Sequence, residues 1–259
     1  MSASKFAIVT GASSGIGLEI AKLAAANGYD LLVAADTPFV DAAAGLNDLG
    51  VEVAQVEGDL STQQGVDQLL AAAGGRDVDV LVANAGTGTG GAFVDVDTQS
   101  WRHSLDTNVT GTLLLIQPVL TAMVARGEGR VLITGSIAGH VPGSFNSVYN
   151  GTKAFIDSFA AAIGNEVKDS GVTITCLKPG ATETEFFARA DMLDTKVAQM
   201  KKDDPADVAK TGWEAMMKGE HSVVHGMINQ AQVLAAGVLP EAVTAAVHRR
   251  LAEPGSGKE

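Results

Sequence analysis

Tyr149 and Lys153 are the pair of residues in this sequence whose types and spacing best suit proton transfer. A separation of four puts the phenol and the ammonium on one face of a helix. Because a positive charge favours the phenolate, we expect Lys153 to lower the pKa of Tyr149 from about 10 towards neutrality. Such a tyrosine can donate a proton to a developing alkoxide or accept one from an alcohol. Ser136 comes thirteen residues earlier, just after an apolar run, and is expected where a parallel sheet binds its ligand.

A glycine-rich turn near the start of the chain is the second segment with a chemical signature. It reads Thr10-Gly11-Ala12-Ser13-Ser14-Gly15-Ile16-Gly17 and joins an apolar run to a helical stretch. Glycine lets the backbone approach phosphate groups, and free N–H groups at a helix start favour anions, so the turn fits a diphosphate; a plain tight turn is the alternative. Asp36 ends the next apolar run, and its carboxylate can accept hydrogen bonds from ribose hydroxyls. The alternative for Asp36 is a strand-end residue before a turn at Thr37-Pro38.

Short apolar runs alternate with longer helical stretches along the chain. Six runs and a weaker seventh, bounded mostly by Gly, Asp or Asn, fit strands covered on both faces: Phe6–Val9, Leu31–Ala35, Val51–Val56, Val80–Val82, Val131–Ile133, Val172–Leu177 and Val223–Val224. The helical stretches are Leu18–Ala26, Val66–Ala73, Trp101–Ala125 and Ala154–Val167. We therefore predict one α/β domain over residues 1–259, a Rossmann-type doubly wound parallel sheet of about seven strands with helices on both faces. Residues 252–259 are expected to form a disordered tail.

Composition and charge argue against several classes of function. Eighteen basic and 30 acidic residues give a net charge of −12, which disfavours nucleic acid as a partner. The single cysteine, Cys176, excludes an internal disulfide and is expected to be a buried strand residue. His221 and His225 flank a predicted strand rather than sharing a helix face, so we expect no metal site. Without a signal segment or a run of about 18 apolar residues, we expect a cytoplasmic protein with no membrane span.

Taken together and in order, these motifs resemble the short-chain dehydrogenase/reductase family over nearly the whole chain, to about Gly226. The matching residues are Thr10 to Gly17, Asp59-Leu60, Asn84-Ala85-Gly86, Asn108 in an Asn-Val-Thr-Gly segment, Ser136, Tyr149, Lys153, Pro179-Gly180 and Thr184. Two positions depart from the family pattern. Ala83 stands where a second Asn often occurs, and Thr182 stands where Val or Ile is common.

The resemblance implies a nicotinamide cofactor, NAD or NADP. The residues that it implies for cofactor binding are Gly11, Ser13, Ser14, Gly15, Ile16, Gly17, Asp36, Asp59, Leu60, Asn84, Ala85, Gly86, Tyr149, Lys153, Pro179, Gly180, Thr182 and Thr184. We expect NAD to be preferred, because no Lys or Arg occurs from Leu23 to Gly75 and Asp36 would repel the additional phosphate of NADP. NADP is the alternative, since hydroxyl and backbone N–H groups or an arginine from a distant segment could hold that phosphate.

The resemblance also implies catalytic roles and a small-molecule alcohol or carbonyl substrate. Tyr149 would be the general acid/base, Lys153 would depress its pKa and hold the nicotinamide ribose, and Ser136 would donate to the substrate oxygen. Asn108 would hold a water that connects Lys153 to solvent. The side chains expected to line the substrate site are His140, Phe186, Phe187 and Met192, the last three on a mobile lid. A solvent-facing loop position for His140, and packing against the sheet for the lid residues, are the alternatives.

Two questions stay open between alternatives at this point. The stretches Trp101–Ala125 and Ala154–Val167 are apolar around much of their surface, and the family pairs these helices, so we expect a homodimer or homotetramer. The leading function is a nicotinamide-dependent oxidoreductase. A catalytically silent dinucleotide-binding regulator or scaffold, or an isomerase or dehydratase on the same fold, is the alternative. Neither the substrate nor the reaction direction is specified by the sequence.

Overall fold

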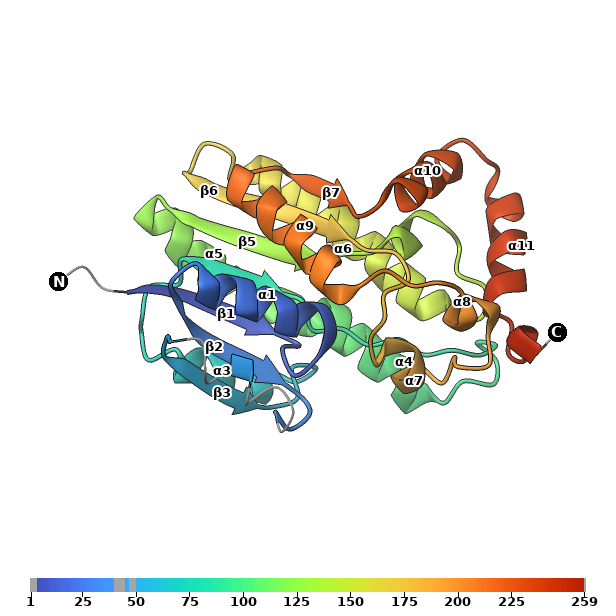
Figure 1. Cartoon of the computed structure of the whole chain (residues 1–259), viewed down its shortest axis with the longest axis horizontal. Coiled ribbons are helices and arrows are strands. Elements are labelled where there is room, and N and C mark those ends of the chain that lie inside the picture. The colour runs from blue at the N-terminus through green and yellow to red at the C-terminus, as the bar shows by residue number, and fades with distance from the viewer. Residues whose placement is uncertain (1–3, 40–44, 47–49, 259) are drawn as a thin grey trace.

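The computed structural model describes residues 4–39, 45–46 and 50–258, and its centre is a seven-stranded parallel sheet (Figure 1). The strands are β1 (Lys5–Thr10), β2 (Tyr29–Ala35), β3 (Val53–Glu57), β4 (Val80–Ala83), β5 (Gly129–Thr134), β6 (Val172–Lys178) and β7 (Ser222–Val224). They lie in the order β3-β2-β1-β4-β5-β6-β7, and every neighbouring pair is parallel. The predicted doubly wound sheet is therefore confirmed, and each predicted run coincides or overlaps with a strand. The strand order reverses between β1 and β4, which is where open parallel sheets bind ligands.

Helices cover both faces of the sheet (Figure 1). One face carries α3 (Gln63–Ala72), α5 (Thr112–Arg126) and α6 (Ser147–Glu166), and the other carries α1 (Gly15–Ala26) and α9 (Pro205–Lys218). Successive strand residues enter different cores: Phe6 and Ile8 pack on the first face, and Ala7 and Val9 on the second. Because both faces are covered, the strands have continuous apolar sequences rather than alternating ones.

The stretch predicted as one helix over Trp101–Ala125 is built from three consecutive segments. These are α4 (Thr98–Leu105), the π-helical η1 (Asp106–Gly111) and α5. Residues 98–126 together are long and apolar enough to cross a membrane by length and composition alone. Leu115, Ile116 and Met123 of α5 are buried against the sheet, and core helices of soluble proteins have the same composition.

The remaining short elements gather where the strands end (Figure 1). They are η2 (Ile137–His140), α7 (Phe186–Arg189), α8 (Lys196–Gln199), α10 (Met227–Ala236), α11 (Glu241–Ala252) and η3 (Ser256–Lys258). The expected disordered tail differs from the structure over residues 252–258. Ala252 is buried, Gly255 N donates to Asp194 Oδ2 at 2.7 Å, and Ser256 Oγ accepts from Lys196 N at 3.0 Å. The tail is ordered because it packs beside α8, a contact between distant segments.

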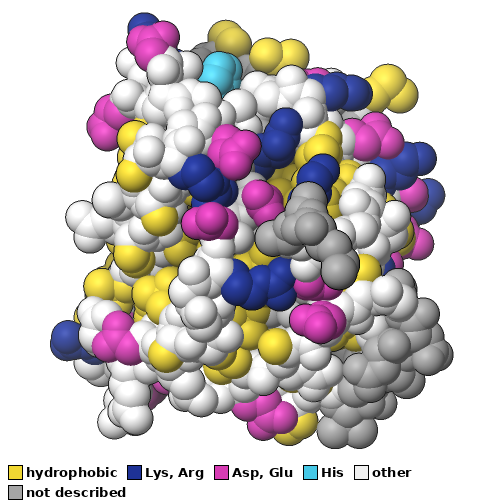
Figure 2. Space-filling view, turned by 90° about the vertical axis from the view of Figure 1, so that its left-hand side faces the viewer, with side chains coloured by type: hydrophobic (Ala, Val, Ile, Leu, Met, Phe, Trp, Pro, Cys, Tyr) yellow, Lys and Arg dark blue, Asp and Glu magenta, His cyan; other side chains and the backbone are white. Residues whose placement is uncertain are grey.

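The opposite end of the sheet, where the strands begin, carries charges of both signs (Figure 2). Arg126 lies 3.3 Å from Asp77 and 3.4 Å from Glu128, and Arg76 lies 2.8 Å from Asp30. Acidic and basic side chains are interleaved and paired on this face. The predicted functional residues are concentrated at the other end of the sheet, where the strands end.

Candidate active site

A cavity of about 490 Å³ lies at the carboxyl ends of the strands. Its walls come from the segments that follow the first six strands, β1 to β6, and from α6, α10 and α11. Of the residues implied for cofactor binding, all except Gly17 line it. Parallel sheets bind ligands at this edge, so the cavity is the candidate active site.

The glycine-rich turn after β1 has the geometry of an anion cradle. Gly11 and Gly15 have positive φ angles of 65° and 57°, and a Cβ on Gly17 would lie 2.1 Å from the Gly11 oxygen. Ser14 begins α1 without a side-chain capping bond, and the first turn of α1 holds no acidic residue. Its N–H groups and helix dipole are therefore available to an anion, and these residues fit the diphosphate of a dinucleotide.

Asp36, which follows β2, meets a cation that the sequence did not reveal. Nη1 of Arg189, on α7, lies 3.2 Å from Asp36 Oδ1, and Nη2 donates to Thr37 Oγ1 at 3.2 Å. Both charged side chains are more than two-fifths exposed. The sequence left open that an arginine from a distant segment could hold the phosphate of NADP. Arg189 is such an arginine, and in this structure it is paired with the Asp36 carboxylate.

The ends of β1, β4 and β5 are joined by side-chain hydrogen bonds. Thr10 Oγ1 accepts from the N–H groups of Asn84 and Ala85, both at 3.0 Å. Asn84 Nδ2 donates to Thr10 O at 3.0 Å, and its Oδ1 accepts from Thr134 Oγ1 at 3.0 Å. These bonds fix the Asn84-Ala85-Gly86 segment in the cavity wall.

Asn108 is placed by the π-helical segment η1, a kind of helix bulge that is frequent at functional sites. Its Oδ1 accepts from Thr87 N at 2.8 Å, and its Nδ2 donates to Thr87 O at 2.8 Å and to Thr152 Oγ1 at 2.9 Å. Lys153, on α6, donates through Nζ to Thr134 O at 2.8 Å. A Cβ on Gly86 would lie 3.2 Å from Asn108 Oδ1 and 3.5 Å from Lys153 Nζ, so both atoms face that glycine.

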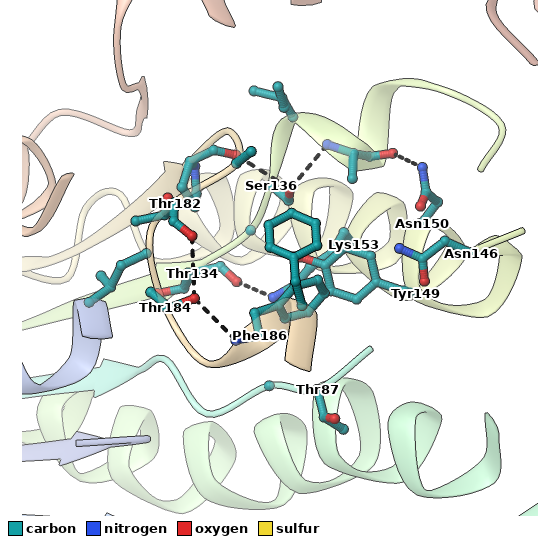
Figure 3. Close-up of a pocket in the computed structure, with 18 of the residues that line it drawn as sticks. Thr87, Thr134, Ser136, Asn146, Tyr149, Asn150, Lys153, Thr182, Thr184 and Phe186 are labelled. Carbon is teal, nitrogen blue, oxygen red and sulfur yellow. Dashed lines mark hydrogen bonds between the residues drawn. The ribbon is translucent and has the colours of Figure 1, made fainter. Parts of the chain in front are cut away.

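Ser136 and Tyr149 meet inside the cavity (Figure 3). Ser136 Oγ accepts from Ala138 N at 3.1 Å and donates to Pro179 O at 3.4 Å. Burial raises the pKa of Tyr149 to about 12, a hydrogen bond with Ser136 lowers that pKa in part, and the charge of Asp157 raises it further. In this structure the pKa of Tyr149 is therefore raised rather than lowered as expected, because burial has the largest effect on it.

Lys153 is buried as well, and this changes its own titration. Burial lowers its pKa to about 8, against the opposing charges of Asp157 and Cys176. Its Nζ lies 5.7 Å from the centre of the Tyr149 ring. At neutral pH the site therefore holds a neutral phenol beside an ammonium that is readily deprotonated.

A buried carboxylate, Asp157, lies one helical turn after Lys153 on α6. Its Oδ2 is 3.6 Å from Lys178 Nζ and 3.4 Å from His140 Nε2, and Cys176 Sγ donates to its Oδ1 at 3.5 Å. Burial raises the pKa of Asp157, and the charge of Lys178 lowers it in part. Cys176 is a buried strand residue, as predicted.

The loop that carries Ser136 leaves room for this carboxylate through two glycines. A Cβ on Gly135 would lie 1.9 Å from Asp157 Oδ1, and a Cβ on Gly139 would lie 2.9 Å from Oδ2. His140 accordingly contacts Asp157 and Lys178 and is not among the cavity-lining residues. Its predicted place in the substrate lining is thus wrong, because η2 turns the imidazole towards α6. The spacing of four after Lys153 is a sequence signal that could have identified Asp157.

The lid residues Phe186, Phe187 and Met192 line the cavity as expected. The Phe186 ring lies 4.8 Å from the Tyr149 ring, centre to centre. Phe187 and Met192 are buried in a small apolar cluster with Ala252 of the C-terminal helix, rather than against the sheet. The lid is therefore closed over Tyr149 and joined to the C-terminal segment.

Within the described part of the chain, no group of three or more His, Cys, Asp or Glu side chains could hold a metal ion. His225 Nδ1 lies 2.8 Å from Thr211 Oγ1, so one of the two spaced histidines has a hydrogen-bonding partner of its own.

Comparison with known proteins places this arrangement in a family. Residues 5–194 match the short chain dehydrogenase family. Serine 3-dehydrogenase of Agrobacterium fabrum is 32% identical over 183 residues, which cover 69% of this chain and 72% of that protein. A short-chain dehydrogenase from Sphingobium yanoikuyae, solved with NADPH, is 25% identical with a TM-score of 0.79, over 92% of this chain and 97% of that one. A relative from Burkholderia phymatum, solved with NAD, is 23% identical and has the same fold, with a TM-score of 0.81 over 89% and 92% of the two chains. The chain belongs to the short-chain dehydrogenase/reductase family of NAD(P)-dependent oxidoreductases.

Proposed function

We propose that the protein interconverts a secondary alcohol and the corresponding carbonyl compound, with Tyr149 as the general acid/base. The observation that carries this proposal is the meeting of Ser136 and Tyr149 in the cavity wall, with Lys153 one helical turn away. A dinucleotide-binding scaffold without turnover requires no such arrangement. The anion cradle at the start of α1 supports the proposal that a dinucleotide binds in this cavity.

In carbonyl reduction, each of these residues would have a separate role. The bound nicotinamide would supply the hydride. The Ser136 hydroxyl would donate a hydrogen bond to the substrate oxygen and polarise the carbonyl. Tyr149 would donate its phenolic proton to that oxygen, and the Lys153 ammonium would stabilise the phenolate that remains.

The titration of these groups favours reduction at neutral pH. Because burial raises the pKa of Tyr149 to about 12, its phenol carries the proton that reduction requires. Asn108 would hold the water through which Lys153 regains its proton, since Asn108 Oδ1 and Lys153 Nζ both face Gly86. Alcohol oxidation needs the phenolate and would therefore be favoured by alkaline conditions.

We also propose that NAD is preferred over NADP. Asp36 lines the cavity at the end of β2, where its carboxylate would accept from ribose hydroxyls and repel a phosphate. The cation that reaches this place, Arg189, is paired with the same carboxylate. The test is kcat/KM with each cofactor for the parent enzyme, for Asp36→Ala and for Arg189→Ala. We expect the NAD preference to fall in Asp36→Ala and to persist in Arg189→Ala. A parent enzyme that favours NADP, and loses that preference in Arg189→Ala, would show that the arginine binds the phosphate.

The proposed activity is tested with a panel of ketones, aldehydes, keto sugars and hydroxy acids, each with both cofactors in both directions. We expect cofactor-dependent turnover of at least one carbonyl compound. Failure of the whole panel, alongside tight binding of NADH, would favour the regulator or scaffold function instead.

A further inference from the structure

We infer that the substrate is a neutral ketone or secondary alcohol with a ring-sized apolar substituent, held between the lid and a roof formed by α10 and α11. This inference rests on the proposed oxidoreductase function and specifies the substrate class of the same site. The resemblance to the family extends only to about Gly226, so the roof is the part of the cavity for which the sequence offered no role.

The two roof helices, α10 and α11, lie beyond the ends of the strands (Figure 1). From α10 and the loop after it, Ala235, Ala236 and Leu239 line the cavity. From α11, Val247 and Leu251 line it. The lid faces the same space with Phe186, Phe187, Met192 and Val197. A substituent in this part of the cavity meets aliphatic and aromatic side chains from two directions.

Contacts with two neighbouring segments hold the roof in place. His248 Nδ1, on α11, lies 3.0 Å from Ser144 O, and Ser144 Oγ donates to Ala245 O at 3.2 Å. The Arg249 guanidinium lies 5.3 Å from the centre of the Phe145 ring. The tail after α11 bonds to the lid segment, with Gly257 N donating to Asp194 O at 2.8 Å. Because these contacts fix the middle and the C-terminal end of α11, this part of the roof is a preformed wall of the site.

The charges in the cavity lining argue for a neutral substrate. Apart from Lys153, the charged lining residues are Asp36 and Asp59 at the cofactor end, and Glu185 and Arg189, which are both exposed. Arg189 is paired with Asp36. Besides Tyr149, the titratable lining residues that remain are His103, which is exposed on α4, and His248, whose pKa is lowered by burial. A carboxylate or phosphate on the substrate would therefore lack a cationic partner in the roof, and the net charge of −12 would repel it.

The size of the substituent follows from the place that Phe186 occupies. Its ring lies 4.8 Å from the Tyr149 ring and is tilted to it by 51°. The ring also lies against Gly88, where a Cβ would be 2.6 Å from Phe186 Cζ. An aromatic six-membered ring thus already packs beside the phenol of Tyr149, and the site accommodates a ring of this size there. A substrate ring that displaces or slides past Phe186 would find the same partners.

The first test uses ketones that differ in one property at a time. Acetone and acetophenone differ in bulk, and para-methylacetophenone and para-carboxyacetophenone differ in charge at similar size. We expect kcat/KM to rise by about tenfold or more from acetone to acetophenone, and to fall by a similar factor from the methyl to the carboxylate compound. Preference for the small or the anionic ketone, in an enzyme that does turn over ketones, would overturn the inference and leave the proposed function intact.

A pair of adjacent substitutions on α10 tests the roof itself. Ala235→Trp places a large side chain in the cavity lining, whereas Leu234→Trp changes a residue that is 73% exposed and outside the lining. We expect Ala235→Trp to lower kcat/KM for acetophenone by about tenfold and for acetone by less than about twofold. Leu234→Trp should leave both values unchanged. Equal losses for both ketones in Ala235→Trp, or equal effects of the two substitutions, would contradict the roof as a substrate wall.

A binding measurement separates this inference from the proposed chemistry. Calorimetry on Tyr149→Phe loaded with NADH reports ketone affinity without turnover. We expect para-methylacetophenone to bind about tenfold more tightly than para-carboxyacetophenone, and Ala235→Trp in the same background to remove this difference. If these results hold while the parent enzyme reduces no ketone, the proposed function fails and the binding inference stands. Equal or tighter binding of the carboxylate compound would overturn the binding inference.

Discussion

Replacing Lys153 by methionine should abolish turnover without unfolding the protein, because the buried ammonium destabilises the fold at neutral pH. Burial lowers the pKa of Lys153 from 10.5 to about 8. At about 1.36 kcal/mol for each pH unit, this difference corresponds to about 3 kcal/mol. Below pH 8 the folded state carries the whole cost of the buried charge. Between pH 8 and 10.5 the unfolded chain holds a proton that the folded chain has lost, so the free energy of unfolding rises with pH.

Methionine removes that cost but leaves Thr134 O without the hydrogen bond that Lys153 donates at 2.8 Å. An unsatisfied buried acceptor costs about 1–3 kcal/mol, so we expect the variant at pH 7 to be as stable as the parent, or more stable by about 2 kcal/mol. Both turnover and cofactor affinity should fall, because one ammonium serves the phenolate and the nicotinamide ribose.

The assay is urea unfolding of the parent and of Lys153→Met at intervals from pH 7 to 10.5, with Lys168→Met, an exposed lysine, as the control. Other titrating groups contribute equally to both proteins, so the difference between the two stability curves isolates Lys153. We expect this difference to change by about 3 kcal/mol in favour of the parent across the range, and the control to follow the parent. Parallel curves for the parent and Lys153→Met, or unchanged cofactor affinity in the variant, would refute the reasoning.

Three further predictions follow from the same geometry. The kcat for reduction should be constant to about pH 8 and fall above it as Lys153 loses its proton, whereas the kcat for oxidation should rise with pH as Tyr149 ionises. Steady-state pH profiles in both directions check this, and a reduction rate that rises above pH 8 would contradict it. Gly135→Ala should destabilise the protein by about 1–3 kcal/mol and lower kcat more than cofactor affinity, because its Cβ would overlap the buried carboxylate of Asp157. The control is Gly151→Ala on α6, which has open space around it and should be neutral or stabilising. Thermal unfolding and kinetic assays of both variants check this. We expect a homodimer or homotetramer through the apolar outer surfaces of α5 and α6, and light scattering that finds a monomer at micromolar concentration would refute this.

The sequence was sufficient to predict the parts of the molecule that depend on local signals. Continuous apolar runs such as Leu31–Ala35 identify strands covered on both faces, and the structure has each of them in the sheet. The turn from Gly11 to Gly17 needs glycines because a side chain on either one would overlap the backbone of the turn or Asn84. The spacing of these glycines can therefore be recognised in the sequence. Tyr149 and Lys153 share one helix face, and their spacing alone places them together.

The features that the sequence did not predict depend on contacts between distant segments. Arg189 reaches Asp36 across 153 residues, and the tail after α11 is ordered by bonds to residues near 194–196. The direction in which the pKa of Tyr149 shifts depends on how deeply the fold buries the phenol. The spacing between Tyr149 and Lys153 does not specify that burial. His140 follows Ser136 closely, but a short helical turn rotates it towards Asp157 and away from the cavity.

The most direct test of the account is Tyr149→Phe, which removes one hydroxyl from the cavity and leaves the ring and its contact with Phe186. We expect the variant to fold and to bind NADH within a few-fold of the parent, measured by fluorescence titration. Its turnover of the best ketone should fall by about 10²- to 10⁴-fold, the usual contribution of a positioned acid/base. Turnover within a few-fold of the parent, with cofactor binding intact, would show that Tyr149 is not the proton donor and would contradict the central claim.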